Sequence, residues 1–370
     1  MNDWLDVNSI EEECYRLTIL SIGTATASAV KVIASGLNLP AEKVAEKLYR
    51  APSVLAENLT RNICLQLASL IQNMGIEIKI ESNDLPPPLP SELFDISIQI
   101  TDIHYLPQVV EQLTPFLGID EASVVSLLIT PPAIILGSVS TATLSSLNNR
   151  LNFPGVTIVS SRPISAKYDL ISAPLTTHQT QQLNRFLQRL QLSLDNNEHL
   201  CLTDLDYTTA QSIWKHFGHN LPLKIINQEF YRYDLLLNAL PTTKEKVAQQ
   251  YLEETIGISP NDYPSIQPHL PLVIQESISH IDAHAREAEF AMHGLNIEKV
   301  NITFQRLRIQ IHEAKDFSSV DSLLQQLGLM DAPLKTLPYI TRDTSETYAR
   351  FAKYLLESRG ASVSYQECVA

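Results

Sequence analysis

Hydrophobic and polar positions change their pattern in a regular order near the start of the chain. Residues 15–22, with the sequence YRLTILSI, are rich in β-branched and aromatic side chains and predict a strand. Residues 27–35 predict a helix that ends at Gly36. Pro40 suits the first turn of a helix, so a second helix is predicted over 41–49.

A third helix is predicted after Pro52, because hydrophobic residues recur there at intervals of three and four. This stripe consists of Leu55, Leu59, Ile63, Leu67, Leu70 and Met74. Gly75 ends the helix. Isoleucines alternate with charged residues over 76–80, which predicts a half-buried strand. The predicted unit is therefore β-α-α-β-α-β, with the fourth element a strand or a turn.

The landmarks of this unit recur along the chain at the same spacing: a hydrophobic residue, a proline 13 residues later and a glycine 36 residues later. The three sets are Leu39, Pro52 and Gly75; Ile119, Pro132 and Gly155; and Ile258, Pro271 and Gly294. Such self-similarity is typical of an array of one small unit. We predict an α+β fold made of about five tandem β-α-α-β-α-β-type domains. The third is degenerate, because it lacks about twelve residues, roughly one helix.

The predicted bounds follow from these landmarks. They are an acidic arm (1–13), repeat 1 (14–82), a proline-rich linker (83–93), repeat 2 (94–161), repeat 3 (162–230), repeat 4 (231–303) and repeat 5 (304–370). The prolines of the linker favour a semi-rigid extended chain, so the join between repeats 1 and 2 is expected to be the most independent hinge. The alternation over 299–311 changes phase at Gln305-Arg306, which predicts a strand that passes from repeat 4 into repeat 5 with a bulge or bend at that point, so these two should move as one body.

Repeat 1 resembles the C-terminal domain of the bacterial ribosomal stalk protein. The matching features are the sequence GLNL at 36–39, Ala51-Pro52, the long helix up to Gly75 and the strand over 76–80. The Clp-protease adaptor fold is a second relative by shape. The stalk resemblance implies a small α+β domain that recruits translational GTPases through basic residues on its first two helices.

Those two helices carry a cluster of basic residues: Lys31, Lys43, Lys47 and Arg50. The resemblance implies a protein-binding role for Lys31 and Lys43, and we extend the candidate surface to all four. The alternative is an ordinary solvated helix face.

Composition and charge disfavour some classes of function. The chain has 370 residues and a net charge of −14, which disfavours binding to a nucleic-acid backbone. It shows no secretory signal and no apolar run of transmembrane length, and its four cysteines are widely spaced, so we expect a cytoplasmic protein without a membrane span. Repeat 1 is net positive (+2), whereas repeats 2 and 4 are acidic (−4 and −5), which indicates different partners or complementary faces of neighbouring subunits.

Repeat 4 holds the best candidate for a metal site. His280 and His284 are four residues apart, with Glu276 and Glu287 one turn to either side. The nearby apolar stripe is expected to take the buried face of the helix and leave the histidines in solvent. This stripe consists of Ile274, Ile278, Ile281, Ala285, Ala288 and Met292. No HExxH motif and no third ligand is evident, so we predict neither a metal nor a cofactor.

Repeat 3 contains the one candidate for catalysis. His199 with Cys201 would form a Cys–His pair, and Asp204 with Asp206 a carboxylate pair. Catalytic partners normally come together from distant parts of a sequence, so neighbours in one irregular segment are weak candidates. His104, Tyr105, Trp4 and Trp214 are expected to serve in packing.

We therefore predict a non-enzymatic protein that binds other proteins or builds an assembly, as a component of a larger secretion, injection or phage-derived machine. Repetition of one module adds docking surfaces and raises avidity without new chemistry. Two alternatives remain open: an adaptor that delivers protein cargo to a translation factor or a Clp-type protease, and an enzyme whose site lies in repeat 3. The predicted partners are proteins, including further copies of the chain.

Overall fold

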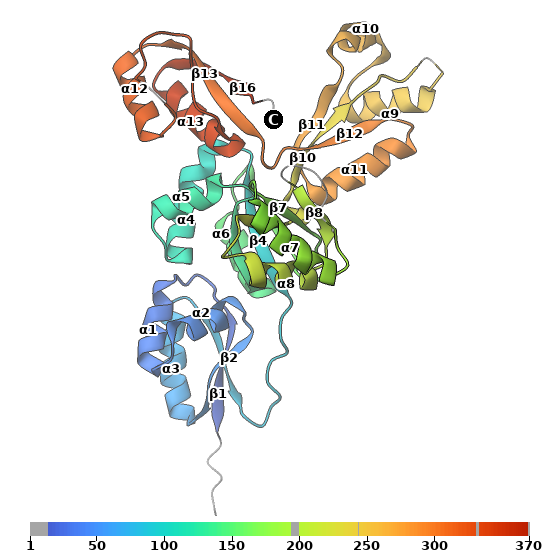
Figure 1. The fold of residues 1–370 in the computed structure, drawn as a ribbon. Helices are drawn as coiled ribbons and strands as arrows, with labels where there is room; N and C mark the ends of the chain where they lie inside the picture. Colours follow the sequence, from blue (N-terminus) through green and yellow to red (C-terminus); the bar gives the residue numbers. More distant parts are fainter. Residues whose placement is uncertain (1–13, 194–199, 243, 331–332, 369–370) are drawn as a thin grey trace, which may run out of the picture. The chain divides into compact units, whose positions relative to one another are not determined.

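The computed structural model describes residues 14–193, 200–242, 244–330 and 333–368 (Figure 1). The predicted α+β class is confirmed, because helices alternate with strands that form five small sheets in the described part of the chain. The chain divides into two compact units: Met1–Ile96, Tyr105–Ser126 and Ile135–Ser160 form the first, and Ser97–His104, Leu127–Ile134 and Ser161–Ala370 form the second. The predicted repeat bounds serve below as labels for parts of the chain.

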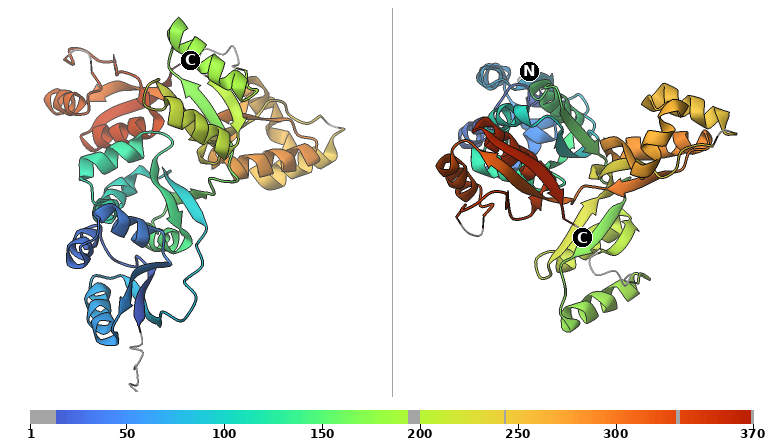
Figure 2. Two further views of the ribbon diagram at one scale, coloured as in Figure 1. Left: turned by 60° about the horizontal axis from the view of Figure 1, so that its bottom comes forward. Right: turned by 90° about the horizontal axis from the view of Figure 1, so that it is seen from above.

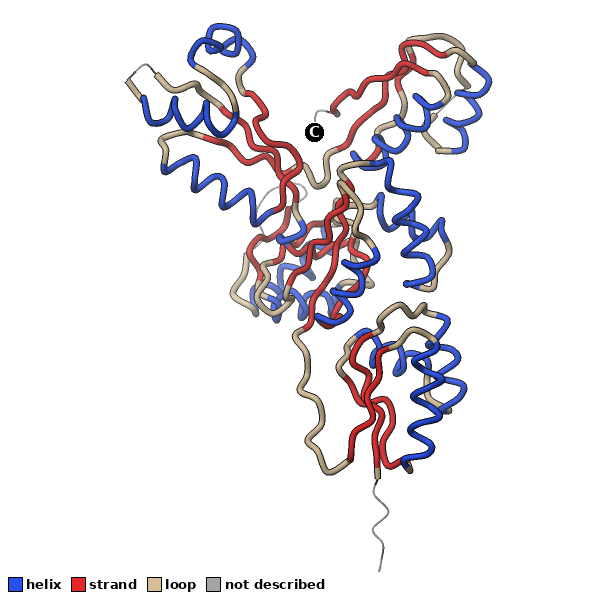
Figure 3. Tube along the Cα trace, turned by 180° about the vertical axis from the view of Figure 1, so that it is seen from behind, coloured by secondary structure: helices blue, strands red, loops and turns tan. Residues whose placement is uncertain are grey.

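Repeat 1 has the predicted order of elements. They are β1 (Tyr15–Ser21), α1 (Ser28–Leu37), α2 (Ala41–Tyr49), β2 (Ser53–Leu59), α3 (Arg61–Asn73) and β3 (Glu77–Ser82). The antiparallel sheet has the order β2-β1-β3, so the first strand is central. The helices lie over one face of this sheet (Figure 3). Leu17 and Ile19 of the central strand are fully buried with Val44 and Cys64 from the helices.

The prediction for the third helix is wrong in its extent. The segment after Pro52 forms β2, which pairs with β1, so Leu55 and Leu59 lie in a strand. The helix α3 buries Cys64, Ala68 and Ile71 instead of the predicted stripe. Ile63 and Leu70 are 44% and 61% exposed. The hydrophobic residues keep a helical spacing across the strand–helix boundary at residue 60, so the spacing alone predicts one continuous helix.

Gly75 ends α3 at a place where no other residue fits easily. Its φ is +90°, and a Cβ there would lie 2.4 Å from the Thr24 hydroxyl oxygen and 3.0 Å from the Ala25 nitrogen. The close approach lets the Thr24 N–H donate to the Gly75 carbonyl at 3.0 Å. Gly75 therefore shapes the loop at residues 23–25 as well as the end of the helix.

Repeat 2 repeats the order of repeat 1. Its elements are β4 (Leu93–Ile100), α4 (Leu106–Leu117), α5 (Glu121–Ile129), β5 (Ile134–Ser140), α6 (Thr141–Arg150) and β6 (Val156–Ser161). The sheet order is β5-β4-β6, so the first strand is again central. The boundary between the two compact units runs through this repeat, with Ser97–His104 and Leu127–Ile134 assigned to the second unit.

Within the first unit, side chains of α6 reach repeat 1 and form what we call the Arg150 join. The Arg150 guanidinium donates to the carbonyls of Gly23 and Ala25 at 3.0 and 2.8 Å and lies 5.0 Å from the centre of the Phe116 ring. The Thr143 hydroxyl donates to the Tyr49 carbonyl at 2.8 Å. Burial raises the pKa of the Tyr49 phenol to about 12.

The linker between repeats 1 and 2 is also held at its start. Arg16 on β1 is buried, and its guanidinium donates to the carbonyl oxygens of Leu85, at 2.9 Å, and of Pro86. The same side chain lies 3.5 Å from the Glu81 carboxylate. The first residues of the linker are therefore fixed against the edge of repeat 1.

Repeat 3 has fewer elements than repeats 1 and 2 in its described residues. Its elements are β7 (Tyr168–Ser172), α7 (Thr177–Arg189), β8 (Leu200–Leu205), α8 (Tyr207–Phe217) and β9 (Leu223–Asn227). The antiparallel sheet keeps the order β8-β7-β9. Among the described residues, no helix lies between α7 and β8, where repeats 1 and 2 have α2 and α5.

Repeat 4 carries only a short second helix. Its elements are β10 (Arg232–Leu237), α9 (Lys246–Ile256), α10 (Tyr263–Ile266), β11 (Leu272–Ser279), α11 (His280–Met292) and β12 (Ile297–Asn301). The helices α9 and α11 lie along the sheet β11-β10-β12 (Figure 2).

The prediction for the buried face of the repeat 4 helix is wrong. Ile274 and Ile278 lie in β11, and α11 buries Ala283 and Phe290. Ile281 is 61% exposed. The rest of the predicted stripe also faces solvent: Ala285, Ala288 and Met292 are exposed, Met292 by 79%. The helix begins at His280 rather than before Ile274, and this shift moves the apolar stripe off the core.

Repeat 5 has a larger sheet and no second helix in its described residues. Its elements are β13 (Arg306–Ala314), α12 (Phe317–Gln326), β14 (Tyr339–Ile340), β15 (Thr344–Ser345), α13 (Glu346–Ser358) and β16 (Ala361–Glu367). The central strand β13 pairs with β14, β15 and β16. The bulge or bend predicted at Gln305-Arg306 corresponds to a turn at residues 303–304, which separates β12 from β13, so the chain forms two strands rather than one bent strand.

Repeats 4 and 5 are nevertheless tied together, by what we call the Arg232 join. The Arg232 guanidinium donates to the Glu346 carboxylate at 2.8 Å, and both side chains are more than nine-tenths buried. Arg350 approaches the other oxygen of the same carboxylate at 2.8 Å. Arg232 also donates to the Ser277 hydroxyl at 3.0 Å. The join is thus a buried ion pair, Arg232 with Glu346, to which the partly exposed Arg350 adds a second cation.

A search of the described helices finds none that is by itself long and apolar enough to cross a membrane. One bent pair, Ile103–Leu117 with Glu121–Ile129, passes the same test by length and composition, with an angle of 115° between its halves.

Candidate functional site

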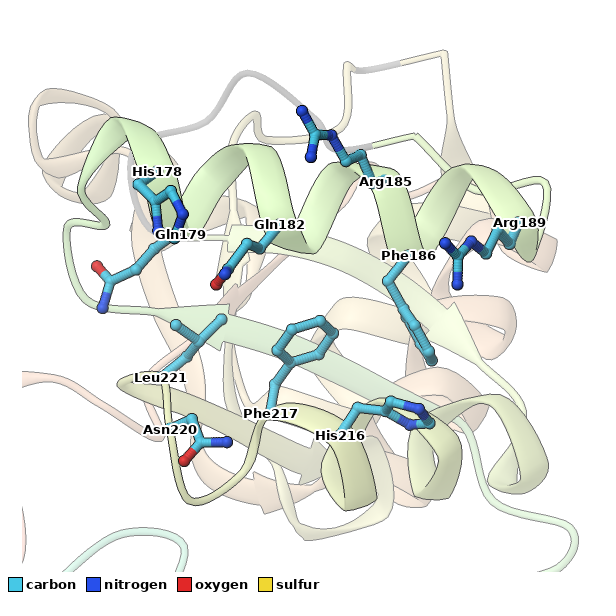
Figure 4. Close-up of a pocket in the computed structure, with 10 residues that line it drawn as sticks. All are labelled: His178, Gln179, Gln182, Arg185, Phe186, Arg189, His216, Phe217, Asn220 and Leu221. Carbon is cyan, nitrogen blue, oxygen red and sulfur yellow. The ribbon is translucent and has the colours of Figure 1, made fainter.

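The clearest candidate site is a groove between the two helices of repeat 3 (Figure 4). It has a volume of about 610 Å³. Its lining comes from one side of α7, from the end of α8 and from the turn that follows: His178, Gln179, Gln182, Arg185, Phe186, Arg189, His216, Phe217, Asn220 and Leu221. Both helices pack against the sheet of repeat 3, so a single repeat provides the whole groove.

The sequence places α7 with one face in the core and another along the groove. Leu183 and Leu187 are fully buried against the sheet. The helix starts at a capping box, in which the Gln179 N–H donates to the Thr176 hydroxyl and the Gln179 side-chain oxygen accepts from the Thr176 N–H at 2.9 Å. The groove residues 178, 182, 185 and 189 recur at intervals of four, three and four, so they share one side of the helix.

Aromatic rings form the floor of the groove. The Phe186 ring packs edge-on against Phe217, with centroids 5.3 Å apart, and lies 4.4 Å from the His216 ring. In Figure 4 these three side chains extend toward one another from α7 and α8. The His216 Nδ1 contacts the Ser212 carbonyl at 3.1 Å, where it can donate if that nitrogen carries the proton. The Nε2 atom is then an acceptor, or a donor when the ring is charged.

The rim of the groove is basic. Arg185 and Arg189 are exposed, and no ion pair to either is found within the described residues. Gln179, Gln182 and Asn220 add amide groups that both donate and accept hydrogen bonds. The residues that line the groove include no carboxylate, serine or cysteine. The groove is therefore suited to hold an extended or helical segment with acidic and apolar side chains.

The four basic residues predicted from sequence have different surroundings. Lys31 and Lys43 are exposed on α1 and α2. The Lys47 ammonium donates to the Val54 carbonyl, and Arg50 contacts the Glu46 carboxylate and donates to the Ser138 carbonyl at 3.1 Å. Lys47 and Arg50 therefore take part in contacts within the first unit, which leaves Lys31 and Lys43 as the more accessible half of the predicted surface.

The two histidines of repeat 4 do come together, with ring centroids 4.4 Å apart, but a lysine occupies the space beside them. The Lys299 ammonium lies 2.9 Å from the His284 Nδ1 and 2.7 Å from the Glu287 carboxylate. Burial, with His284 and Lys299 nearby, lowers the pKa of His280 to about 4. No cluster of three or more metal-ligating side chains occurs within the described residues.

The catalytic candidates of repeat 3 have structural positions where they are described. Asp206 caps α8 by accepting from the Thr209 N–H at 2.9 Å, and hydrogen bonds from Thr208 and Thr209 lower the pKa of its carboxyl to about 2. Asp204 accepts from the Gln228 amide at 3.1 Å. His199 and the side chain of Cys201 lie outside the described residues.

Sequence reasoning missed the groove because it examined the irregular segment after α7 rather than α7 itself. The spacing of His178, Gln182, Arg185 and Arg189 was a signal that these residues share one helix side. The contribution of His216 and Phe217 could not be read in this way, since it depends on how α7 and α8 pack over the same sheet.

Comparison with known proteins identifies no family that shares this groove. No protein-family model matches the chain, and a search of curated proteins finds no significant match. The resemblance of repeat 1 to the ribosomal stalk domain therefore stays a prediction.

Proposed function

We propose that this chain is a non-enzymatic, multi-domain protein that binds other proteins, built as a tandem array of small α+β modules. The observation that carries the proposal is the groove between α7 and α8. It combines an aromatic floor with exposed guanidinium groups, and this combination suits recognition of an acidic peptide segment.

The partner we expect presents aspartate or glutamate next to apolar side chains. Guanidinium groups bind carboxylates through paired hydrogen bonds, which gives direction to the contact. The rings of Phe186 and Phe217 offer apolar area beside the charges. The recurrence of similar modules supports a scaffold role, because each further module adds a docking surface at high effective concentration.

Capture from the native host tests the proposal. The tagged protein, an Arg185→Glu/Arg189→Glu variant and a Lys215→Glu control would each be used to purify companions for mass spectrometry. Lys215 is exposed on α8 but does not line the groove, so the control makes the same kind of charge reversal outside the site, with half the change in net charge. We expect companions that bind the wild type and the control but not the groove variant. Identical companions in all three would contradict the proposal.

A defined probe gives a second readout that does not depend on the host. A fluorescein-labelled synthetic peptide rich in glutamate and leucine would be titrated with the same three proteins and followed by fluorescence anisotropy. We expect binding that weakens as salt is added and that is lost in the groove variant. Equal affinity for the groove variant and the control would show that the peptide binds elsewhere.

A further inference from the structure

Two helices carry apolar stripes that the structure leaves in solvent. On α3 and the residue that follows it, the stripe is Ile63, Leu67, Leu70 and Met74, with Ile63 and Leu70 exposed and the other two half-buried. On α11 it is Ile281, Ala285, Ala288 and Met292, all exposed. Isolated exposed hydrophobic residues are ordinary, whereas a continuous row along a helix marks an interaction surface.

The two stripes match each other in length and spacing. Each has residues at intervals of four, three and four, so each extends about 16 Å along one side of its helix. Rows with this spacing allow two helices to pack with the side chains of one between those of the other. The small Ala285 and Ala288 at the middle of the α11 stripe leave room for larger side chains such as Leu67 and Leu70.

The two repeats that carry the stripes have net charges of opposite sign. Repeat 1, which carries α3, has seven basic and five acidic residues. Repeat 4, which carries α11, has five basic and ten acidic residues. A face on a positive module and a face on a negative module attract each other, whereas two copies of the same face repel when the net charge is large.

We propose that α3 of one molecule packs against α11 of a second copy of this chain, in a head-to-tail contact. The two faces differ, so the contact is heterologous: in a pair, one molecule keeps a free α11 face and the other keeps a free α3 face. Such contacts continue into chains unless the geometry closes a ring. This inference does not involve the α7–α8 groove, so it can fail or succeed independently of the proposed peptide site.

Single substitutions on each face test the contact. Leu70→Glu and Met292→Glu each place a charge in the middle or at the end of one stripe, at positions exposed enough to leave the fold intact. Leu65→Glu is the matched control, since Leu65 is 53% exposed on the opposite flank of α3. Light scattering on size-exclusion fractions would be measured at about 1 to 100 µM, which brackets the weaker range of protein interfaces.

We expect the wild type and Leu65→Glu to grow in mass with concentration, and each stripe variant alone to stay monomeric. The decisive sample is an equimolar mixture of Leu70→Glu with Met292→Glu. One variant keeps its α11 face and the other its α3 face, so the mixture should form 1:1 dimers and nothing larger. Circular dichroism of each variant confirms that the fold is retained.

Three results would overturn the proposal. A wild-type protein that stays monomeric throughout the range has no such contact. Loss of association in Leu70→Glu with none in Met292→Glu would indicate a symmetric α3–α3 contact. A mixture of the two variants that remains monomeric would show that the two faces do not bind each other.

Discussion

The Arg150 join and the Arg232 join both hold neighbouring repeats with a buried or half-buried arginine, but they compensate its charge by different means. Arg150 meets neutral groups, the carbonyls of Gly23 and Ala25 and the ring of Phe116. Arg232 meets a full negative charge on Glu346, which it shares with Arg350. A buried charge can be stabilised by oriented dipoles or by a counter-charge, and the two solutions respond differently when one residue is removed.

The difference predicts where each join is most sensitive. In the Arg232 join one anion serves two cations, so loss of Glu346 leaves two guanidinium groups without their partner. In the Arg150 join the loss of the cation leaves only carbonyl oxygens without a partner. An unpaired carbonyl costs less free energy than an unpaired charge.

The largest effect is expected for Glu346→Gln. Removal of one partner from a buried ion pair typically costs about 3–5 kcal/mol in the free energy of unfolding. Urea unfolding followed by circular dichroism measures the loss. Glu357→Gln is the control on the same helix, because its contact with Lys353 at 3.7 Å is at the surface. We expect the control to change stability by less than about 0.5 kcal/mol.

A double variant separates lost charge balance from lost packing in the same join. Arg232→Met combined with Glu346→Leu replaces the buried pair by apolar side chains, and such replacements are often neutral or stabilising. We expect it to recover most of the stability lost in Glu346→Gln, because the cation that remains, Arg350, is partly exposed and can be solvated by water. If the double variant is as unstable as the single one, the side-chain hydrogen bonds of Arg232 matter more than its charge.

The next effect concerns Gly75, which lies close to Thr24 in the loop whose carbonyls bind Arg150. In Gly75→Ala the new methyl group meets Thr24 and the backbone adopts an unfavourable φ, so we expect a loss of about 2–3 kcal/mol. Gly294 has a similar φ of +79° but nothing within 4 Å of an added Cβ. Gly294→Ala should therefore cost only about 1 kcal/mol. Equal losses in thermal unfolding would show that the contact with Thr24 is unimportant.

Arg150→Met should have a smaller effect than Glu346→Gln. The substitution removes two charged hydrogen bonds but keeps much of the side chain's packing against Phe116, so we expect a loss of about 1.5–2 kcal/mol. Lys167→Met, at an exposed position of the second unit, gives the cost of removing a surface charge. An Arg150→Met loss as large as that of Glu346→Gln would remove the contrast between the two joins.

The smallest expected effect is a dependence on pH at His280. Its pKa is lowered from 6.5 to about 4, because burial and the neighbouring His284 and Lys299 disfavour its charge more than Asp169 and Asp204 favour it. As the pH falls below about 6.5 the unfolded chain takes up this proton before the folded one does, so stability is lost between about pH 6.5 and 4.

The difference between the melting temperatures at about pH 7 and about pH 5 measures this loss of stability. His280→Gln should reduce the drop between the two values, whereas His178→Gln, at an exposed position of repeat 3, should leave it unchanged. Because the His280 ring is only half-buried, the difference should be small. A drop that is the same in wild type and His280→Gln would place the pH dependence on other groups.

The sequence was sufficient for features that depend on local patterns. The strand at Tyr15 and the end of α3 at Gly75 both follow from residue type and spacing. It was insufficient where two elements adjoin. Leu55 and Ile63 continue one helical phase in the sequence, yet a strand ends and a helix begins between them. Periodicity alone cannot locate such a change of phase.

The candidate site and the joins could not be predicted, because each depends on packing between distant segments. Phe186 and His216 meet only when α7 and α8 lie over one sheet. Arg232 and Glu346 are 114 residues apart, and nothing in either neighbourhood identifies the other. The contacts of Arg150 could not be predicted either, because the backbone carbonyls that it binds carry no sequence signal. The sequence therefore predicts only a hinge at the linker.

The fixed start of the linker has a consequence for how the chain could be divided. Arg16 holds the carbonyls of Leu85 and Pro86 against repeat 1, while the Arg150 join ties repeat 2 to the same repeat from another direction. The peptide between Pro87 and Glu92 is thus the covalent connection between repeats 1 and 2, and the hydrogen bonds between them add connections that are not covalent. A polypeptide made in two pieces that meet at this point should reassemble by itself, which would allow each piece to be labelled, exchanged or reordered separately.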